Sequence, residues 1–91
     1  MVKKIRTFSL LRYAEAALVQ AEYEHDEDGV IIAQVPGVSG FFAQGDTFEA
    51  ARANLRDVIE GNVLLALQLG FDIPNIQGIV IEEQDAQAIA A

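Results

Sequence analysis

The side chains that could do acid–base or metal chemistry gather in one short stretch, His25-Asp26-Glu27-Asp28. His25 is the only histidine, and a general base of this kind needs a nucleophile and a group that orients its ring. No nucleophile elbow, zinc-binding histidine pair or Cys–His signature occurs in the sequence. We therefore predict no catalytic residue, and we interpret His25 as a strand-end histidine that makes a local hydrogen bond.

The acidic turn of residues 26–29 could bind a divalent cation through carboxylate oxygens. It lacks the alternating ligand positions and the distant bidentate glutamate of a calcium loop. A two-metal nuclease would need carboxylates that converge from separate elements, and Asp46, Glu49 or Asp57 could join such a set. A metal-dependent RNA hydrolase is therefore the least favoured hypothesis, and we predict a solvated turn with no metal and no cofactor.

The glycine-rich segment Val35 to Thr47 (VPGVSGFFAQGDT) raises the question of a phosphate site. Its three glycines match neither a dinucleotide fingerprint nor a P-loop, and no lysine lies near them. They favour tight backbone turns around a short strand. Because neighbouring side chains of a strand point to opposite faces, one of Phe41 and Phe42 is expected to face outward. An exposed aromatic near a strand edge is typical of a protein-contact site.

Hydrophobic periodicity predicts one α+β domain over residues 1–91, with tails at 1–8 and 83–91, the second of them mobile. The predicted elements are a helix from Leu10 to about Ala17 capped by Ser9, strands at 19–26, 30–35 and 41–44, a helix from Phe48 to Leu69, and a strand at 79–81. Strand 30–35 is nearly all apolar at both its odd and its even positions, which predicts a central strand covered on both faces. Asp46 and Thr47 are equally good caps for the long helix, and Gly70 is expected to end it.

Short connections make the first three strands an antiparallel meander. The long helix is expected to cross one face of this sheet and return the last strand to it, which gives the order α-β-β-β-α-β. The core stripe of the long helix is predicted to run through Leu55 and Ile59 to Leu65 and Leu69.

The charge of the chain is acidic and uneven. The formal net charge is −8, and the segment from Tyr13 onward carries −12 because only two basic residues there face all 14 acidic ones. Such a surface repels nucleic acid and favours a basic partner. The sequence has no run of about 20 apolar residues that would cross a membrane, no signal-peptide pattern and no cysteine, so we expect a cytoplasmic protein.

The second half of the long helix is more apolar than one sheet contact requires. Val63, Leu64 and Leu67 form a further stripe beside the core stripe. A helix that is hydrophobic nearly all round is buried on more than one side. We therefore expect a homo-oligomer, a dimer or tetramer, that uses these three side chains.

From about Tyr23 to Glu82 the sequence resembles the HicB-like antitoxins. The most specific residues are Val35-Pro36-Gly37, then Gly40, then Gly45-Asp46-Thr47-Phe48-Glu49-Ala50, followed by the IPNIQGIVIE ending. The resemblance implies a partial ribonuclease-H-like fold in which the last strand lies beside and parallel to the first. About nine residues follow Glu82, too few for the DNA-binding domain that many members carry, so we expect a short stand-alone member.

The resemblance also implies a function. HicB-like proteins neutralise a HicA-like toxin, a small basic RNA-cleaving protein, by covering its active site. The hypothesis for this chain is such a protein contact, made without direct nucleic-acid binding, and the alternative is a solitary oligomeric module with no toxin. The candidate partner-binding residues are Glu22, Glu24, Asp26, Val38, Phe41 and Phe42.

Overall fold

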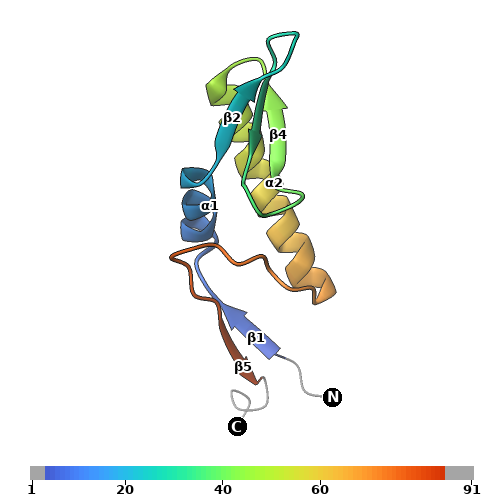
Figure 1. Cartoon of the computed structure of the whole chain (residues 1–91). Helices are drawn as coiled ribbons and strands as arrows, with labels where there is room; N and C mark the ends of the chain where they lie inside the picture. The colour runs from blue at the N-terminus through green and yellow to red at the C-terminus, as the bar shows by residue number, and fades with distance from the viewer. Residues whose placement is uncertain (1–3, 86–91) are drawn as a thin grey trace.

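The computed structural model describes residues 4–85 and has α+β architecture (Figure 1). Its elements are β1 (Lys4–Thr7), α1 (Leu10–Val19), β2 (Glu22–His25), β3 (Ile31–Gln34), β4 (Phe42–Gly45), α2 (Phe48–Leu69) and β5 (Glu82–Asp85). The α+β class and the order of the five middle elements are confirmed. The chain also has a strand, β1, in a segment predicted to be a tail.

Both helices begin at a hydroxyl cap. The Ser9 Oγ accepts a hydrogen bond from the Arg12 backbone N–H at 3.2 Å, and the Thr47 Oγ1 accepts one from the Ala50 N–H at 3.0 Å. Thr47, and not Asp46, is therefore the cap of α2. Gly70 ends α2 in the left-handed region at φ +74°, where a glycine carries no steric penalty, so both predicted bounds of this helix are confirmed.

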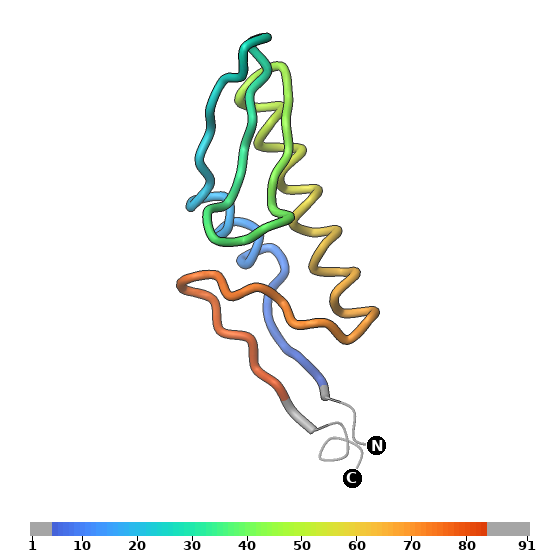
Figure 2. Tube along the Cα trace, turned by 45° about the vertical axis from the view of Figure 1, so that its right-hand side comes forward, coloured from blue at the N-terminus to red at the C-terminus, as the bar shows by residue number. Residues whose placement is uncertain are grey.

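The three middle strands form an antiparallel sheet in the order β2-β3-β4, which confirms the meander and the central place of β3. The prediction that β3 is covered on both faces is wrong. Ile31 and Ala33 are buried, but Ile32 is only half-buried and Gln34 is exposed. Helix α2 runs along one side of this sheet, so the sheet and the helix make two layers (Figure 2).

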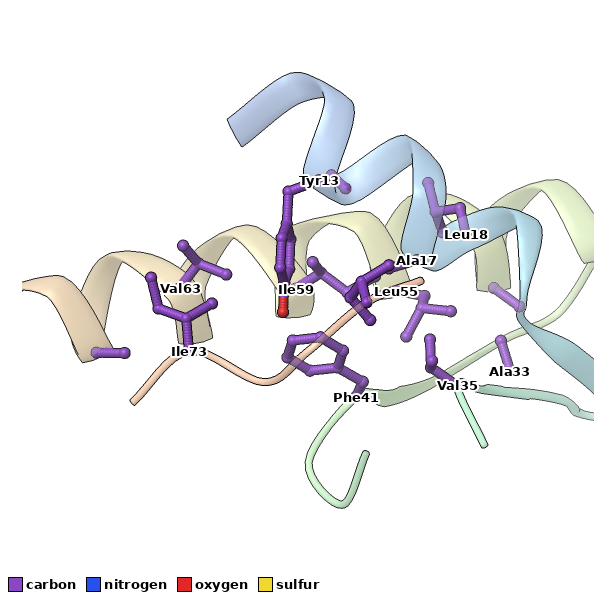
Figure 3. Packing of buried hydrophobic residues seen from close by; sticks show 14 of the residues in the cluster. Tyr13, Ala17, Leu18, Ala33, Val35, Phe41, Leu55, Ile59, Val63 and Ile73 are labelled. Carbon is purple, nitrogen blue, oxygen red and sulfur yellow. The ribbon is translucent and has the colours of Figure 1, made fainter. Parts of the chain in front are cut away.

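The core lies between the sheet, α2 and α1 (Figure 3). Tyr13 is completely buried there, and its ring meets Phe41 edge-on at a centroid distance of 6.4 Å. The Tyr13 hydroxyl donates a hydrogen bond to the Pro74 carbonyl oxygen at 2.6 Å. Burial raises the pKa of Tyr13 to about 12. This bond holds the segment that follows α2 against α1.

The C-terminal segment departs from the prediction. Residues 79–81 are not a strand, and Val80 is 79% exposed. Strand β5 begins three residues later and pairs antiparallel with β1 in a separate two-stranded sheet, so it does not lie parallel to β2. The chain is directed away from the larger sheet because Ile73 and Ile76 are buried in the core just after α2. Residues 83–85 were predicted to be a tail and instead belong to β5. Residues 86–91 of that tail, and residues 1–3 of the predicted N-terminal tail, lie outside the described residues.

Strands β1 and β5 form an arm that projects from the body, below the sheet in Figure 1. The Arg6 guanidinium joins the arm to the end of α2 by donating hydrogen bonds to the carbonyl oxygens of Phe71 and Ala66. A cation at a helix C-terminus is favourable because the last carbonyl groups carry partial negative charge. The described part of the molecule measures 57 × 23 × 19 Å. Neither α1 nor α2 is long and apolar enough to cross a membrane.

Candidate protein-binding face

One face of the three-stranded sheet is left open. Alternation along the strands places one set of side chains toward α2 and the other set away from it. Ala33 and Ala43, which are partners in register, belong to the inner set. The outer set, called here the outer face, consists of Glu22, Glu24, Ile32, Gln34, Phe42 and Gln44.

The register arranges the outer face in two rows across the strands. In the first row Gln34 pairs with Glu22 on one side and with Phe42 on the other. In the second row Ile32 lies between Glu24 and Gln44. Directly opposed side chains of an antiparallel pair are close enough to form a continuous surface. Phe42 is 63% exposed and Ile32 is half-buried, so the surface combines an aromatic ring with aliphatic and polar groups.

The outer face is acidic along one edge. Both carboxylates belong to β2, which is an edge strand of the sheet. None of the strands β2, β3 and β4 carries a lysine or arginine. An acidic edge beside an exposed aromatic ring suits a basic protein surface with an apolar recess.

The structure brings three of the six predicted partner-binding residues together on one face and buries a fourth in the core. Glu22, Glu24 and Phe42 share the outer face. Phe41 points to the opposite side, where it is only 2% exposed and packs against Tyr13, so its assignment to a contact surface was wrong. The prediction that one of the two phenylalanines faces outward is confirmed, and the outer one is Phe42.

Asp26 is engaged within its own turn. Its Oδ1 accepts hydrogen bonds from the backbone N–H groups of Asp28 at 2.8 Å and Val30 at 2.9 Å. This Asx-type turn fixes the β2–β3 connection, with Gly29 at φ +82°. Within residues 4–85 no group of three or more His, Asp or Glu side chains is placed to hold a metal ion.

Val38 lies half-buried in the connection between β3 and β4. The Val38 N–H bonds the Val35 carbonyl oxygen at 3.2 Å, and the Phe41 N–H bonds the Val38 carbonyl oxygen at 3.3 Å. Gly37 at φ +80° and Gly40 at φ +99° each occupy the third position of these successive turns, where positive φ favours glycine. The glycines therefore shape the connection, and residues 34–39 line a shallow hollow beside the outer face.

His25 contacts the beginning of α2. Its ring meets Phe48 edge-on at 5.6 Å between centroids, and the Tyr23 ring meets the same phenylalanine at 5.8 Å. The prediction foresaw a local hydrogen bond and missed this aromatic contact. The cluster lies on the α2 side of the sheet, away from the outer face.

The three predicted self-association residues do not share one exposed surface. Val63 is fully buried in the core, so it is not available to a second chain and the prediction for it was wrong. Leu64 is 50% exposed and Leu67 is 37% exposed.

Three members of the outer face were not predicted from the sequence: Ile32, Gln34 and Gln44. Their signal was present in the alternation of β3 and β4. It was obscured because the apolar run around Ile32 indicated a strand covered on both sides.

Three comparisons relate this chain to known proteins. Residues 12–84 match the family described as UPF0150-like, a span that leaves β1 outside. A UPF0150 protein of Synechocystis sp., ssr1258, is 43% identical over 37 residues, which cover 41% of this chain and 54% of that protein. The match therefore spans about half the length of that relative.

A solved structure has a similar fold. The crystal structure of TTHA0281 from Thermus thermophilus superposes with a TM-score of 0.73 at 31% sequence identity, covering 80% of this chain and 91% of that one. Because the family match covers most of the chain, from α1 to β5, the chain belongs to the UPF0150-like family.

Proposed function

We propose that this chain is a HicB-like, antitoxin-type binding protein that docks its outer face on a small basic RNA-cleaving toxin and covers the toxin's active site. The observation that carries the proposal is the position of exposed Phe42 on the same open sheet face as Glu22 and Glu24. The HicB-like motif residues agree with it, since Gly37 and Gly40 build the turns that lead into β4 and Thr47 caps α2.

The aromatic ring supplies the anchor of the contact. A side chain that is more than half exposed in the free protein can bury a large apolar area in a partner's recess, and such anchors carry much of the binding energy. The strand below is held rigidly, because β4 pairs with β3 and the Asn54 side chain donates a hydrogen bond to the Gln44 carbonyl oxygen at 2.8 Å. The ring is thus presented with little loss of conformational entropy on binding.

The carboxylates orient the partner and speed its association with this chain. An acidic chain attracts a basic toxin over a distance of several ångströms, and Glu22 and Glu24 then pair with its basic groups at the edge of the contact. Neutralisation needs no chemistry in this mechanism. Occlusion of the toxin's catalytic groups is sufficient to stop RNA cleavage.

The test is co-expression with the product of the neighbouring reading frame, followed by purification and an RNA-cleavage assay. The proposal predicts a salt-sensitive complex in which cleavage is abolished. Phe42→Ala, and separately the double variant Glu22→Lys/Glu24→Lys, should each raise the Kd at least about tenfold. The control Glu15→Lys/Asp57→Lys makes the same charge change at exposed helix positions and should change the Kd far less. A basic RNA-cleaving neighbour that forms no complex with the chain would refute the proposal.

A second candidate function is a solitary oligomeric module with no toxin partner. It is favoured by the exposed leucines in the second half of α2. The same co-expression experiment separates the two candidates, because a solitary module has no toxin to neutralise.

A further inference from the structure

Helix α2 changes character halfway along its length. Its first half, Phe48–Glu60, contains five charged residues, whereas Gly61–Leu69 contains none. A surface helix normally carries charged or polar residues opposite its core face. In the second half of α2 the exposed positions are instead mostly leucines. Leu64, Leu65, Leu67 and Leu69 are 37–55% exposed, and Phe71 just beyond the helix is 60% exposed.

This apolar surface is open because the end of α2 extends past the sheet, as Figures 1 and 2 show. Val63 and Ala66 bury the inner side of the helix here. Gly61, Leu64 and Leu67 are all exposed and follow one another at three-residue spacing, so they form one row along the helix, with Leu67 nearest to the buried side. We call these three residues the leucine face.

Gly61 has no explanation within a single chain. A glycine in the middle of a helix is unfavourable relative to alanine because it loses more conformational freedom on folding. A Cβ atom added at Gly61 would meet no atom within 4 Å, and its φ is not positive, so neither packing nor backbone geometry requires glycine. A bare backbone at this position does, however, allow another helix to approach closely.

We propose that the leucine face binds the leucine face of a second copy of this chain, with the two α2 helices antiparallel about a two-fold axis near Leu64. In this arrangement Gly61 of each copy faces Leu67 of the other, because both lie three positions from the axis. Each leucine then fills the space above the opposite glycine. The contact is self-complementary, as a two-fold interface must be.

The charge distribution selects a second copy as the occupant. A basic partner would find no carboxylate to pair with between Gly61 and Phe71. Two copies of a chain with net charge −8 repel each other wherever acidic groups meet, and this uncharged part of α2 lets them approach without that cost. The outer face lies on the far side of the sheet from α2, so a dimer would leave both outer faces free.

The test is the mass of the isolated chain in solution by sedimentation equilibrium. The wild-type chain is expected to be a dimer at micromolar concentration, and Leu64→Glu/Leu67→Glu is expected to be a monomer with unchanged far-UV circular dichroism. Leu11→Glu is the matched control, since Leu11 is 60% exposed on α1, and it should remain a dimer.

A second variant separates association from helix stability. Gly61→Gln improves the helix propensity of α2 and should raise the thermal midpoint of the monomeric Leu64→Glu/Leu67→Glu background. In the wild-type background it should weaken dimerisation at least tenfold, because the glutamine side chain fills the gap above residue 61. A monomeric wild type, a series of larger species, or dimers that survive both variants would each overturn the proposal.

Dimerisation through the leucine face does not require a toxin partner. Phe42→Ala should raise the Kd for the toxin at least about tenfold and leave the dimer intact. Leu64→Glu/Leu67→Glu should abolish the dimer and leave the Kd for the toxin unchanged. Failure of one proposal is therefore distinguishable from failure of the other.

Discussion

Phe41 and Phe42 are adjacent in the chain and lie on opposite sides of the sheet, 2% and 63% exposed respectively. The pair links the hydrophobic core to the outer face of the sheet. Phe41 closes the core against Tyr13, which fixes the start of β4. Because strand alternation then turns Phe42 outward, the same rigid strand presents an aromatic ring to solvent.

The buried phenol of Tyr13 predicts a dependence of stability on alkaline pH. Burial raises its pKa from 10.0 to about 12, so between these values the unfolded chain releases a proton that the folded chain retains. The free energy of unfolding should therefore fall as pH rises from 10 to 12, by on the order of 2 kcal/mol. Below pH 10 the contribution of Tyr13 to stability is fully present. Urea titrations across this range measure the slope.

Tyr13→Phe is the matched variant for this effect. It should remove the Tyr13 contribution to the slope and cost about 1 kcal/mol at neutral pH, because the Pro74 carbonyl oxygen loses its donor. Equal slopes in the two proteins between pH 10 and 12 would show that Tyr13 is not buried as described.

Gly45 is required by the close approach of β4 to α2. A Cβ atom at this position would lie 2.5 Å from the Ala51 nitrogen and 2.8 Å from the Ala50 carbonyl carbon, and both are backbone atoms. Gly45→Ala should therefore destabilise the protein by about 1–3 kcal/mol in denaturant titrations. The neighbouring exposed position provides the control, since Gln44→Ala should change stability by less than about 0.5 kcal/mol.

The cap of α2 can be tested by paired substitutions at adjacent positions. Thr47→Ala removes the acceptor for the Ala50 N–H and should cost about 1 kcal/mol. Asp46→Ala should cost less than half as much, because the Asp46 side chain is not the cap. Thermal melts of the two variants measure these losses of stability. A larger loss for Asp46→Ala than for Thr47→Ala would show that Asp46, and not Thr47, caps α2.

Arg6 is predicted to control the opening of the arm. A two-stranded sheet is marginally stable by itself in water, and Arg6 ties β1 to the carbonyl groups at the end of α2. Arg6→Gln should speed amide hydrogen exchange in β1 and β5 severalfold and leave β2, β3 and β4 unchanged. Arg12→Gln, in α1, is the control. Exchange that is unchanged in the arm of Arg6→Gln would show that this contact does not hold it.

Local signals in the sequence were sufficient for much of the fold. The long helix has a cap at Thr47, a regular stripe through Leu55 and Ile59, and a terminating Gly70, so its bounds follow from short-range rules. The meander follows because its strands are joined by short turns. The outward position of one phenylalanine follows from alternation alone.

The remaining features depend on contacts between distant segments. Strand β5 is wholly polar, β1 contains a single apolar residue, Ile5, and the two strands lie at opposite ends of the chain, so no periodic pattern marks them as a pair. The core stripe of α2 was wrong beyond Ile59, because there the helix packs Val63 and Ala66 toward the core and leaves Leu65 and Leu69 exposed. The sequence does not show which segments pack against each part of α2. For the same reason Val63 was predicted to belong to an outer stripe.

The most direct test of the outer face is chemical-shift mapping of the isotopically labelled chain with the basic RNA-cleaving partner proposed above, taken from the neighbouring reading frame. We predict that the largest changes occur in the backbone amides of β2, β3 and β4 and in the Phe42 ring, and that they are lost in Phe42→Ala. Changes concentrated in α1 or the arm, with the outer face unaffected, would contradict the proposed mode of binding.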